Sequence, residues 1–260
     1  MKRHYIELWL LFAVSFAIFA VASAFEMPEI AGHKLRSSEI AETFIKSRTD
    51  VPLPPARDSL PLLSESLCVP APCDTTSQVI LLFGDSMLEG LGPRLAAYAD
   101  ANGHELYTVM WYSSTSRRWG ETDRLRNYIR KLRPTFIFVC LGANEMFVRD
   151  IEQKHDKYVK NILADIGDIP YVWIGPPNWK PDTGINRLIR ANTAEGSFFL
   201  SDGMEFRRVA DGAHPTYESA HEWMDSVVRW IPASRHPIKL DKPTKQTSRA
   251  KRVFVHKPNE

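Results

Sequence analysis

The sequence of residues 78–86 is QVILLFGDS, an apolar run that ends in Gly84-Asp85-Ser86. A short, continuous run of large apolar residues bounded by a polar residue and a glycine predicts a strand that is buried on both faces. Glycine allows the backbone to turn sharply after such a strand. Ser86 is therefore predicted at the carboxyl edge of a sheet, near the start of the next helix.

The same alternation of strand and helix signals continues along the chain. The predicted strands are Val79–Phe83, Leu106–Trp111, Thr135–Leu141, Tyr171–Ile174 and Ser197–Leu200. The predicted helices are Gly92–Ala101, Thr122–Leu132, Gln153–Ile166, Thr183–Ala194 and Tyr217–Trp230. Apolar strands that alternate with helices indicate a three-layer α/β/α sandwich around a mostly parallel sheet of about five strands. Ligands of such open sheets bind beyond the carboxyl ends of the strands.

The N-terminus has the composition of a secretory signal. Residues 2–4 are Lys-Arg-His, an uncharged apolar run covers residues 8–22, and residues 22–24 are the small residues that a signal peptidase accepts. We predict that residues 1–24 are a signal peptide and that the remainder is exported to the periplasm or the cell exterior. Because the apolar run is nearly long enough to span a bilayer, an uncleaved anchor at residues 5–24 is the alternative.

Residues 25–77 are predicted to form a proline-rich arm or stalk. Proline is dense between residues 51 and 72, which favours extended backbone. Export would place Cys68 and Cys73, which are close in sequence, where they can form a disulfide. Cys140 lies in an apolar run and is predicted to be a buried free thiol.

Residues 78–232 are predicted to be the folded domain, and residues 233–260 a basic, disordered tail. Seven Lys or Arg and two Asp or Glu give residues 239–260 a charge of +5, whereas the whole chain has +2. A short basic terminus can contact anionic polymer or lipid, although most are solvated. Since no stripe of aromatic and basic residues accompanies it, nucleic acid is not an expected partner.

Three connections that follow predicted strands carry residues suited to nucleophilic catalysis. Ser86 supplies a hydroxyl, and its backbone N–H can face an oxyanion. Asn144 carries an amide that donates hydrogen bonds without competing as an acid. Asp211 and His214 are three positions apart in a glycine-containing turn, so the carboxylate can orient the imidazole as a base. Taken singly, Ser86 is more typical of a helix cap than of a nucleophile, and Asn144 is equally typical of a turn or cap residue.

The other histidines are weaker candidates. His221 lies on the last predicted helix and is the alternative base. His104, His155 and His236 are not paired with a carboxylate in a turn, as His214 is with Asp211, and are predicted at the surface. No cysteine stands near a histidine in the spacing of zinc ligands, so no metal is predicted, and the chemistry requires no cofactor.

These motifs together resemble the sequence blocks of SGNH (GDSL-like) hydrolases. Residues 83–86 (FGDS), 142–145 (GANE) and 211–214 (DGAH) are similar to the first, third and fifth blocks. Residues 112–116 (YSSTS) resemble the second block of an exported branch, and the resemblance covers residues 79–231. The superfamily includes esterases, lipases, carbohydrate O-acetyl esterases and related polysaccharide O-acetyltransferases. Its fold, a three-layer α/β/α sandwich, agrees with the alternation of strands and helices.

The resemblance implies acyl transfer through an acyl-enzyme on Ser86, with His214 as base and Asp211 as its orienting acid. It also implies an oxyanion hole formed by the backbone N–H groups of Ser86 and Ser116 and by the Asn144 amide. The chain departs from the family pattern twice. Ser116 occupies the place of a glycine, and a glutamate follows Asn144 where the family usually has an aspartate.

The predicted substrate is an acylated carbohydrate or another small ester, with O-acetyl as the expected acyl group. Aromatic and basic residues cluster after the second strand, at the expected mouth of the site: Trp111, Tyr112, Arg117, Arg118 and Trp119. Aromatic rings stack on sugars and arginine binds carboxylate or phosphate, while ordinary packing beside a solvated loop is the alternative. A polysaccharide O-acetyltransferase and a catalytically silent glycan-binding module are the competing functions.

Overall fold

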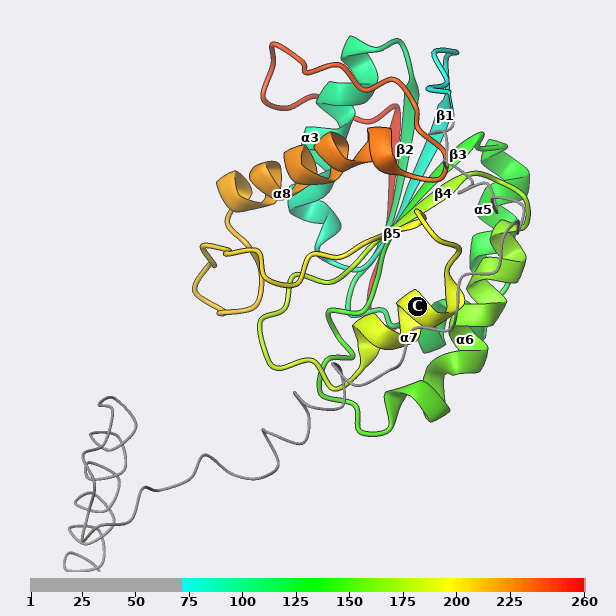
Figure 1. Cartoon of the computed structure of the whole chain (residues 1–260), viewed down its shortest axis with the longest axis vertical. Coiled ribbons are helices and arrows are strands. Elements are labelled where there is room, and N and C mark those ends of the chain that lie inside the picture. Colours follow the sequence, from blue (N-terminus) through cyan, green and yellow to red (C-terminus); the bar gives the residue numbers. More distant parts are fainter. Residues whose placement is uncertain (1–71, 260) are drawn as a thin grey trace, which may run out of the picture. The chain divides into compact units, whose positions relative to one another are not determined.

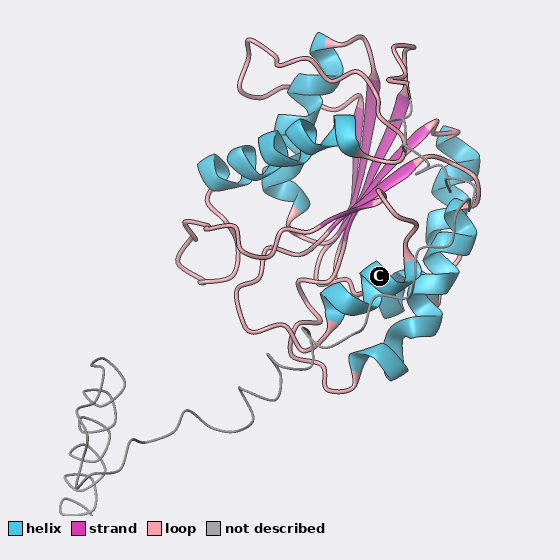
Figure 2. Cartoon of the chain, viewed as in Figure 1, coloured by secondary structure: helices cyan, strands magenta, loops and turns pink. Residues whose placement is uncertain are grey.

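A computed structural model describes residues 72–259 of the chain. The predicted signal segment, most of the predicted arm, and Cys68 lie outside the described residues. Within them, a parallel sheet is enclosed between two layers of helices (Figures 1 and 2). The predicted three-layer α/β/α sandwich is confirmed.

The sheet has six strands in the order β5-β4-β3-β1-β2-β6. They are β1 (Val79–Gly84), β2 (Glu105–Trp111), β3 (Phe136–Cys140), β4 (Tyr171–Ile174), β5 (Phe198–Phe199) and β6 (Arg252–His256). All neighbouring pairs are parallel. The chain passes from β1 to β2 on one side and then to β3 on the other, so the strand order reverses beside β1. A reversal of this kind opens a crevice at the carboxyl ends of the strands, where Ser86 follows β1.

Helices cover both faces of the sheet, and α3 and α8 lie on the face opposite α5, α6 and α7 (Figure 1). The helices are α3 (Leu88–Ala101), α4 (Ser116–Gly120), α5 (Arg124–Leu132), α6 (Ile151–Ile166), α7 (Ile185–Asn192) and α8 (Tyr217–Trp230), followed by the 3₁₀ turn Ile231–Ala233. Within β1, Ile80 and Leu82 pack toward α3 and α8, whereas Leu81 and Phe83 face the other helices. Both faces of the strand are therefore buried, as its apolar run predicts.

Helix α3 begins at Leu88, four residues before the predicted start at Gly92. Gly90 and Pro93 have low helix propensity, so the sequence did not predict a helix in this first turn. Tertiary packing outweighs that propensity. A Cβ at Gly90 would lie 2.4 Å from the Cβ of Ala220, so the glycine allows α3 to approach α8 closely.

The prediction of a disordered tail from residue 233 is wrong. Residues 252–256 form strand β6, which pairs with β2 in the register Tyr107↔Arg252 to Trp111↔His256. The sheet therefore has one strand more than predicted, and the folded domain extends well past residue 232. The many lysines and prolines of this segment concealed a short apolar run, Val253–Val255, that completes the sheet at its edge.

Arg94, a buried residue of α3, ties the C-terminal segment to the domain. Its Nη1 donates to the carbonyl oxygens of Lys245 and Gln246 at 3.1 and 3.0 Å. Its Nε pairs with the Asp225 carboxylate of α8 at 2.6 Å. One buried guanidinium thus links two elements that are distant in sequence, and no local pattern could have shown this.

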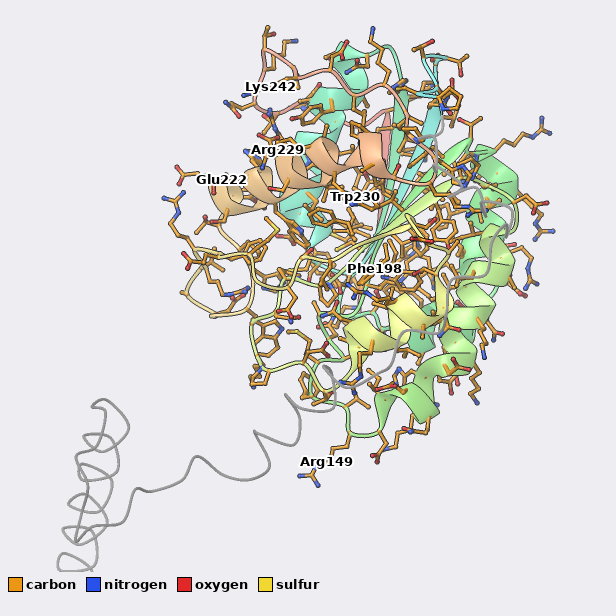
Figure 3. The ribbon with its side chains drawn as sticks, in the orientation of Figure 1. Arg149, Phe198, Glu222, Arg229, Trp230 and Lys242 are labelled. Carbon is orange, nitrogen blue, oxygen red and sulfur yellow. The ribbon has the colours of Figure 1, made fainter. Side chains whose placement is uncertain are left out.

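Charged side chains lie mainly at the surface. Figure 3 shows Arg149, Glu222 and Lys242 pointing away from the sheet. Within residues 72–259, no helix combines the length and the apolar composition needed to cross a membrane.

Cys140 is buried as predicted, and burial raises the pKa of its thiol well above the ordinary value. Cys73 is exposed, and its predicted disulfide with Cys68 stays a prediction.

Candidate active site

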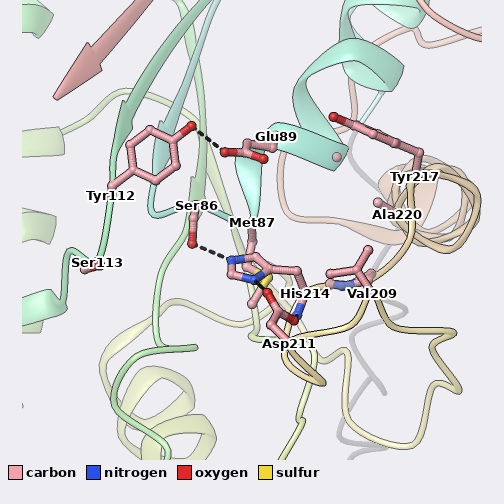
Figure 4. Close-up of a pocket in the computed structure, with 12 residues that line it drawn as sticks. Ser86, Met87, Glu89, Tyr112, Ser113, Val209, Asp211, His214, Tyr217 and Ala220 are labelled. Atoms are coloured by element: carbon pink, nitrogen blue, oxygen red, sulfur yellow. Dashed lines mark hydrogen bonds and ion pairs between the residues drawn. The ribbon is translucent and has the colours of Figure 1, made fainter. Parts of the chain in front are cut away.

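Ser86, His214 and Asp211 form a continuous chain of hydrogen bonds (Figure 4). Ser86 Oγ lies 2.8 Å from His214 Nε2, and His214 Nδ1 lies 2.6 Å from Asp211 Oδ2. An ionised carboxylate can only accept, so Nδ1 carries the ring proton and Nε2 is left to accept the hydroxyl proton of Ser86. This is the geometry of a Ser–His–Asp catalytic triad. His214, and not His221, is the histidine that faces Ser86.

The end of β1 places Ser86 at the sheet edge. A Cβ on Gly84 would lie 2.0 Å from the carbonyl oxygen of Cys140 on β3, so only glycine allows the two strands to run this close at that point. The Asp85 N–H then donates to the same carbonyl at 3.2 Å. Ser86 follows immediately, two residues before α3 begins, where the partial positive charge of the helix N-terminus favours a developing anion.

Arginine contacts and a helix cap hold the loop that carries His214. Arg208 Nη2 donates to the carbonyl oxygens of Pro177 and Asn178 at 3.2 and 2.8 Å, and Nη1 donates to the carbonyl of Ala213. Thr216 caps α8 by accepting from the Ser219 N–H. The imidazole is thus fixed between a tethered loop and a helix start.

Asp211 is held as a carboxylate by its own turn. Its Oδ1 accepts the backbone N–H groups of His214 and Ala213 at 2.9 and 2.8 Å. These two bonds and the side-chain bond to His214 lower the pKa of Asp211 from 3.8 to about 2. Asp211 therefore stays ionised in mildly acidic solution, and its charge stabilises the imidazolium that forms when His214 takes a proton.

Asp85, unlike Asp211, lies in surroundings that raise the pKa of its carboxyl group. Its side chain is fully buried, and its Oδ1 accepts the Met87 N–H at 3.0 Å. Burial, reinforced by the neighbouring Glu145, raises the pKa of Asp85 from 3.8 to about 7. A buried carboxyl that resists ionisation binds its proton more tightly in the folded than in the unfolded chain.

This difference predicts a pH dependence of stability. The folded state gains from the tightly bound proton below about pH 4, and this gain is lost as the pH rises through about 7. The change is on the order of a few kcal/mol. We expect Asp85→Asn, which cannot ionise but can still accept from Met87, to flatten the decline in unfolding free energy between pH 4 and 8. Urea unfolding of both proteins across this range measures it, and an equal slope in the two proteins would contradict the assignment.

Ser116 was wrongly predicted as an oxyanion donor. Its N–H donates to Glu145 Oε2 at 2.8 Å and its Oγ to Glu145 Oε1 at 2.5 Å, both in buried surroundings. A carboxylate that already takes this N–H leaves it unavailable to a substrate. Glu145, one methylene longer than the family's usual aspartate, thus anchors the start of α4.

Ser113 is the better candidate for the backbone donor. It lines the same cavity as Ser86, and its N–H has no hydrogen-bond partner among residues 72–259. Its φ of 53° lies in the left-handed region that glycine favours, which fits the glycine expected in the second block. The sequence offered no sign of this conformation, because serine rarely adopts it.

Asn144 supports the Ser113 loop. Its Nδ2 donates to the carbonyl of Ser114 at 2.9 Å and makes a long contact of 3.5 Å to Asp85 Oδ2. One amide hydrogen is therefore committed to the loop, and the other is weakly engaged. The predicted donation from Asn144 to an oxyanion stays a prediction.

Two histidines expected at the surface are partly or fully buried and have partners. His155 Nδ1 lies 2.6 Å from Glu145 Oε1 and joins the cluster that holds Ser116. His104 is buried, accepts the Gln78 N–H and contacts the Lys239 carbonyl. The partners Glu145, Gln78 and Lys239 lie 10, 26 and 135 residues away along the chain, so the sequence next to each histidine did not indicate them.

The residues predicted to bind substrate mostly do not reach the cavity. The indoles of Trp111 and Trp119 are 3% and 0% exposed and belong to the core, so their predicted role was wrong. Arg117 forms a surface ion pair on α4, and Arg118 lies over the Trp111 ring at 5.1 Å. Of the five, Tyr112 alone lines the cavity that holds Ser86.

The cavity at the triad has a volume of about 390 Å³ and takes most of its walls from other residues. Its lining consists of Ser86, Met87, Glu89, Gly90, Tyr112, Ser113, Val209, Asp211, His214, Pro215, Tyr217 and Ala220. The Tyr112 hydroxyl donates to the Glu89 carboxylate, and this bond raises the pKa of Tyr112 to about 12. The sequence did not identify Glu89 and Tyr217 as lining residues. Each belongs to the first turn of a helix, where position along the sequence does not show which way the side chain points.

Within residues 72–259, neither His221 nor a group of acidic side chains forms a second candidate site. The buried Nε2 of His221 has no hydrogen-bond partner in the described part of the chain, and burial lowers its pKa. Across residues 72–259, no three His, Cys, Asp or Glu side chains are grouped so that they could hold a metal ion.

Comparisons with known proteins find similarity only at the level of solved structures. No protein-family model matches the chain, and no curated protein matches it. The esterase EstA from Pseudoalteromonas sp. is 17% identical with a TM-score of 0.44 and covers 60% of this chain and 97% of its own. A protein assigned to the lipolytic G-D-S-L family from Desulfitobacterium hafniense is 13% identical, covering 58% and 98%, with a TM-score of 0.44.

A third similar structure is the salicylyl-acyltransferase SsfX3 of a tetracycline biosynthetic pathway. It is 17% identical with a TM-score of 0.41, covering 62% of this chain and 56% of its own. Because the sequence identities to these structures are low, any activity inferred for this chain rests on the geometry of its own site.

Proposed function

We propose that this chain is a serine hydrolase of the SGNH (GDSL-like) type that cleaves carboxylic esters through an acyl-enzyme. The observation that carries the proposal is the unbroken hydrogen-bond chain from Asp211 through His214 to Ser86, in the wall of an open cavity. A nucleophile, an oriented base and a space for substrate are the parts that ester hydrolysis requires.

The reaction proceeds in two acyl transfers. Ser86 Oγ attacks the ester carbonyl carbon while its proton passes to His214 Nε2. The tetrahedral intermediate collapses, and His214 gives that proton to the departing alcohol oxygen. Water then loses a proton to His214, attacks the acyl-enzyme, and releases the carboxylic acid as Ser86 recovers its proton.

In the tetrahedral intermediate, hydrogen-bond donors stabilise the negative charge on the former carbonyl oxygen. We assign this role to the N–H groups of Ser86 and Ser113, with the Asn144 amide as a third donor. Each donor of this kind typically contributes about 100- to 1,000-fold to turnover.

The proposed substrate is an O-acyl ester of a carbohydrate that the exported protein meets outside the cytoplasm. Export is proposed from the composition of residues 1–24. The rings of Tyr112 and Tyr217 border the cavity, and aromatic faces of this kind stack on sugars. Acetyl remains the acyl group expected from the sequence.

A polysaccharide O-acetyltransferase is the second candidate, because a sugar hydroxyl can replace water in the second step with the same residues. Purified protein is therefore to be incubated with an O-acetylated polysaccharide, with and without oligosaccharide acceptors. We expect free acetate without any added acceptor. Acetate that appears only as a new sugar ester would favour the transferase. No acyl release of either kind would favour a glycan-binding module without catalysis.

A further inference from the structure

The charged residues that line the catalytic cavity are acidic. Asp211 belongs to the triad, and Glu89 lies in the first turn of α3, three residues after Ser86. Among the described residues, no lysine or arginine lines this cavity. His214 acts as a neutral base in the resting enzyme and adds no positive charge. The site therefore presents negative charge to an ester that approaches Ser86.

The charge of Glu89 is oriented by a neighbour but not neutralised by it. Within residues 72–259, the one hydrogen bond to its carboxylate comes from the Tyr112 hydroxyl (Figure 4). This bond raises the pKa of Tyr112 to about 12, so the hydroxyl keeps its proton in neutral solution. A neutral donor holds the carboxylate in place and leaves its negative charge available to a ligand.

Two arginines lie near the cavity without lining it. Arg208 donates to three backbone carbonyls of the surrounding loops, and these bonds hold its guanidinium there. Arg249 is exposed and lines an adjacent cavity. Neither guanidinium takes the place of a cationic partner for Glu89 inside the catalytic cavity.

Aromatic rings accompany the carboxylate. Tyr112 and Tyr217 both line the cavity with Glu89, and Tyr217 is 65% exposed. The face of an aromatic ring attracts a cation, and a carboxylate adds a direct Coulomb attraction. A carboxylate beside two tyrosine rings is therefore suited to an ammonium group.

We propose that Glu89, with the rings of Tyr112 and Tyr217, selects esters that carry an ammonium group. The inference rests on the proposed esterase function and names the substrate class of the same site. An O-acylated amino sugar with a free amine carries such a group, and so does an aminoacyl ester of a sugar. The sequence had favoured an anionic substrate held by Arg117 or Arg118, but neither arginine lines the cavity.

The test measures kcat/KM of the full chain for two pairs of esters of matched shape. Acetylcholine and 3,3-dimethylbutyl acetate place a cation or a neutral tert-butyl group on the alcohol. The p-nitrophenyl esters of betaine and of 3,3-dimethylbutanoic acid place the same groups on the acyl side. The two pairs thus show which end of the ester carries the cation.

For each pair, the cation-to-neutral ratio of the wild type is divided by that of Glu89→Gln, which cancels the intrinsic reactivities of the esters. We expect this quotient to be at least about 3 for one of the pairs. The wild-type ratio for that pair should also fall when NaCl is raised from about 20 mM to about 1 M, because salt screens the carboxylate.

Glu222→Gln, at an exposed position of α8 outside the lining, is the matched control and should leave both ratios unchanged. Glu89 is itself exposed, so Glu89→Gln should fold, and circular dichroism checks this. A quotient below about 3 for both pairs, with the neutral esters hydrolysed, would overturn the ammonium selection and leave the esterase intact. Absence of hydrolysis of all four esters by the wild type would instead reject the proposed function, and the selection with it.

Discussion

Replacement of Ser86 by alanine is expected to lower kcat/KM for ester hydrolysis by about 10⁴- to 10⁶-fold, as loss of a nucleophile does in enzymes with this triad. The effect is large because no water in the site can match a hydroxyl already 2.8 Å from its base. The Ser86 side chain makes no other hydrogen bond within the described residues, so the fold should survive its removal.

Circular dichroism and thermal unfolding check the fold of Ser86→Ala, and hydrolysis of p-nitrophenyl esters measures the loss. Ser226→Ala, on α8 and outside the lining of the cavity, serves as the matched serine control. A folded Ser86→Ala protein with near-normal turnover would show that another residue is the nucleophile.

His214→Ala should lower turnover by a similar factor, because the proton of Ser86 then has no acceptor and Asp211 is left without its partner. His221→Ala should change turnover by less than about threefold, since the hydrogen bond to Ser86 comes from His214 alone among the described histidines. The two variants are compared by kcat at saturating ester. The reverse ranking would mean that His221 is the base and that the triad described here is structural.

The core of the fold followed from the sequence because its signals are local. The predicted first strand and last helix agree almost to the residue with β1 and α8. Ser86, Asp211 and His214 came with them, because each stands where a strand ends or a helix starts. The edge of a parallel sheet then brings such positions together.

The remaining features depend on partners that are far away in sequence. The Ser116 N–H resembled an oxyanion donor until the fold placed Glu145 against it. Trp119 resembled a surface aromatic next to two arginines, yet its indole is fully buried and donates to Ser114 Oγ. Strand β6 pairs with the edge of β2, and Arg94 binds the carbonyl of Lys245 in the segment that leads to it. A tail of lysines and prolines reveals neither partner.

Covalent labelling by a fluorophosphonate tests the central claim most directly, because it traps an activated serine without requiring the natural substrate. The reagent should add once to the native protein, and peptide mapping by mass spectrometry should place the adduct on Ser86. Labelling should be lost in Ser86→Ala, strongly slowed in His214→Ala and unchanged in His221→Ala. An adduct on a different serine, or no adduct on correctly folded protein, would contradict the assignment of Ser86 as the nucleophile of an esterase.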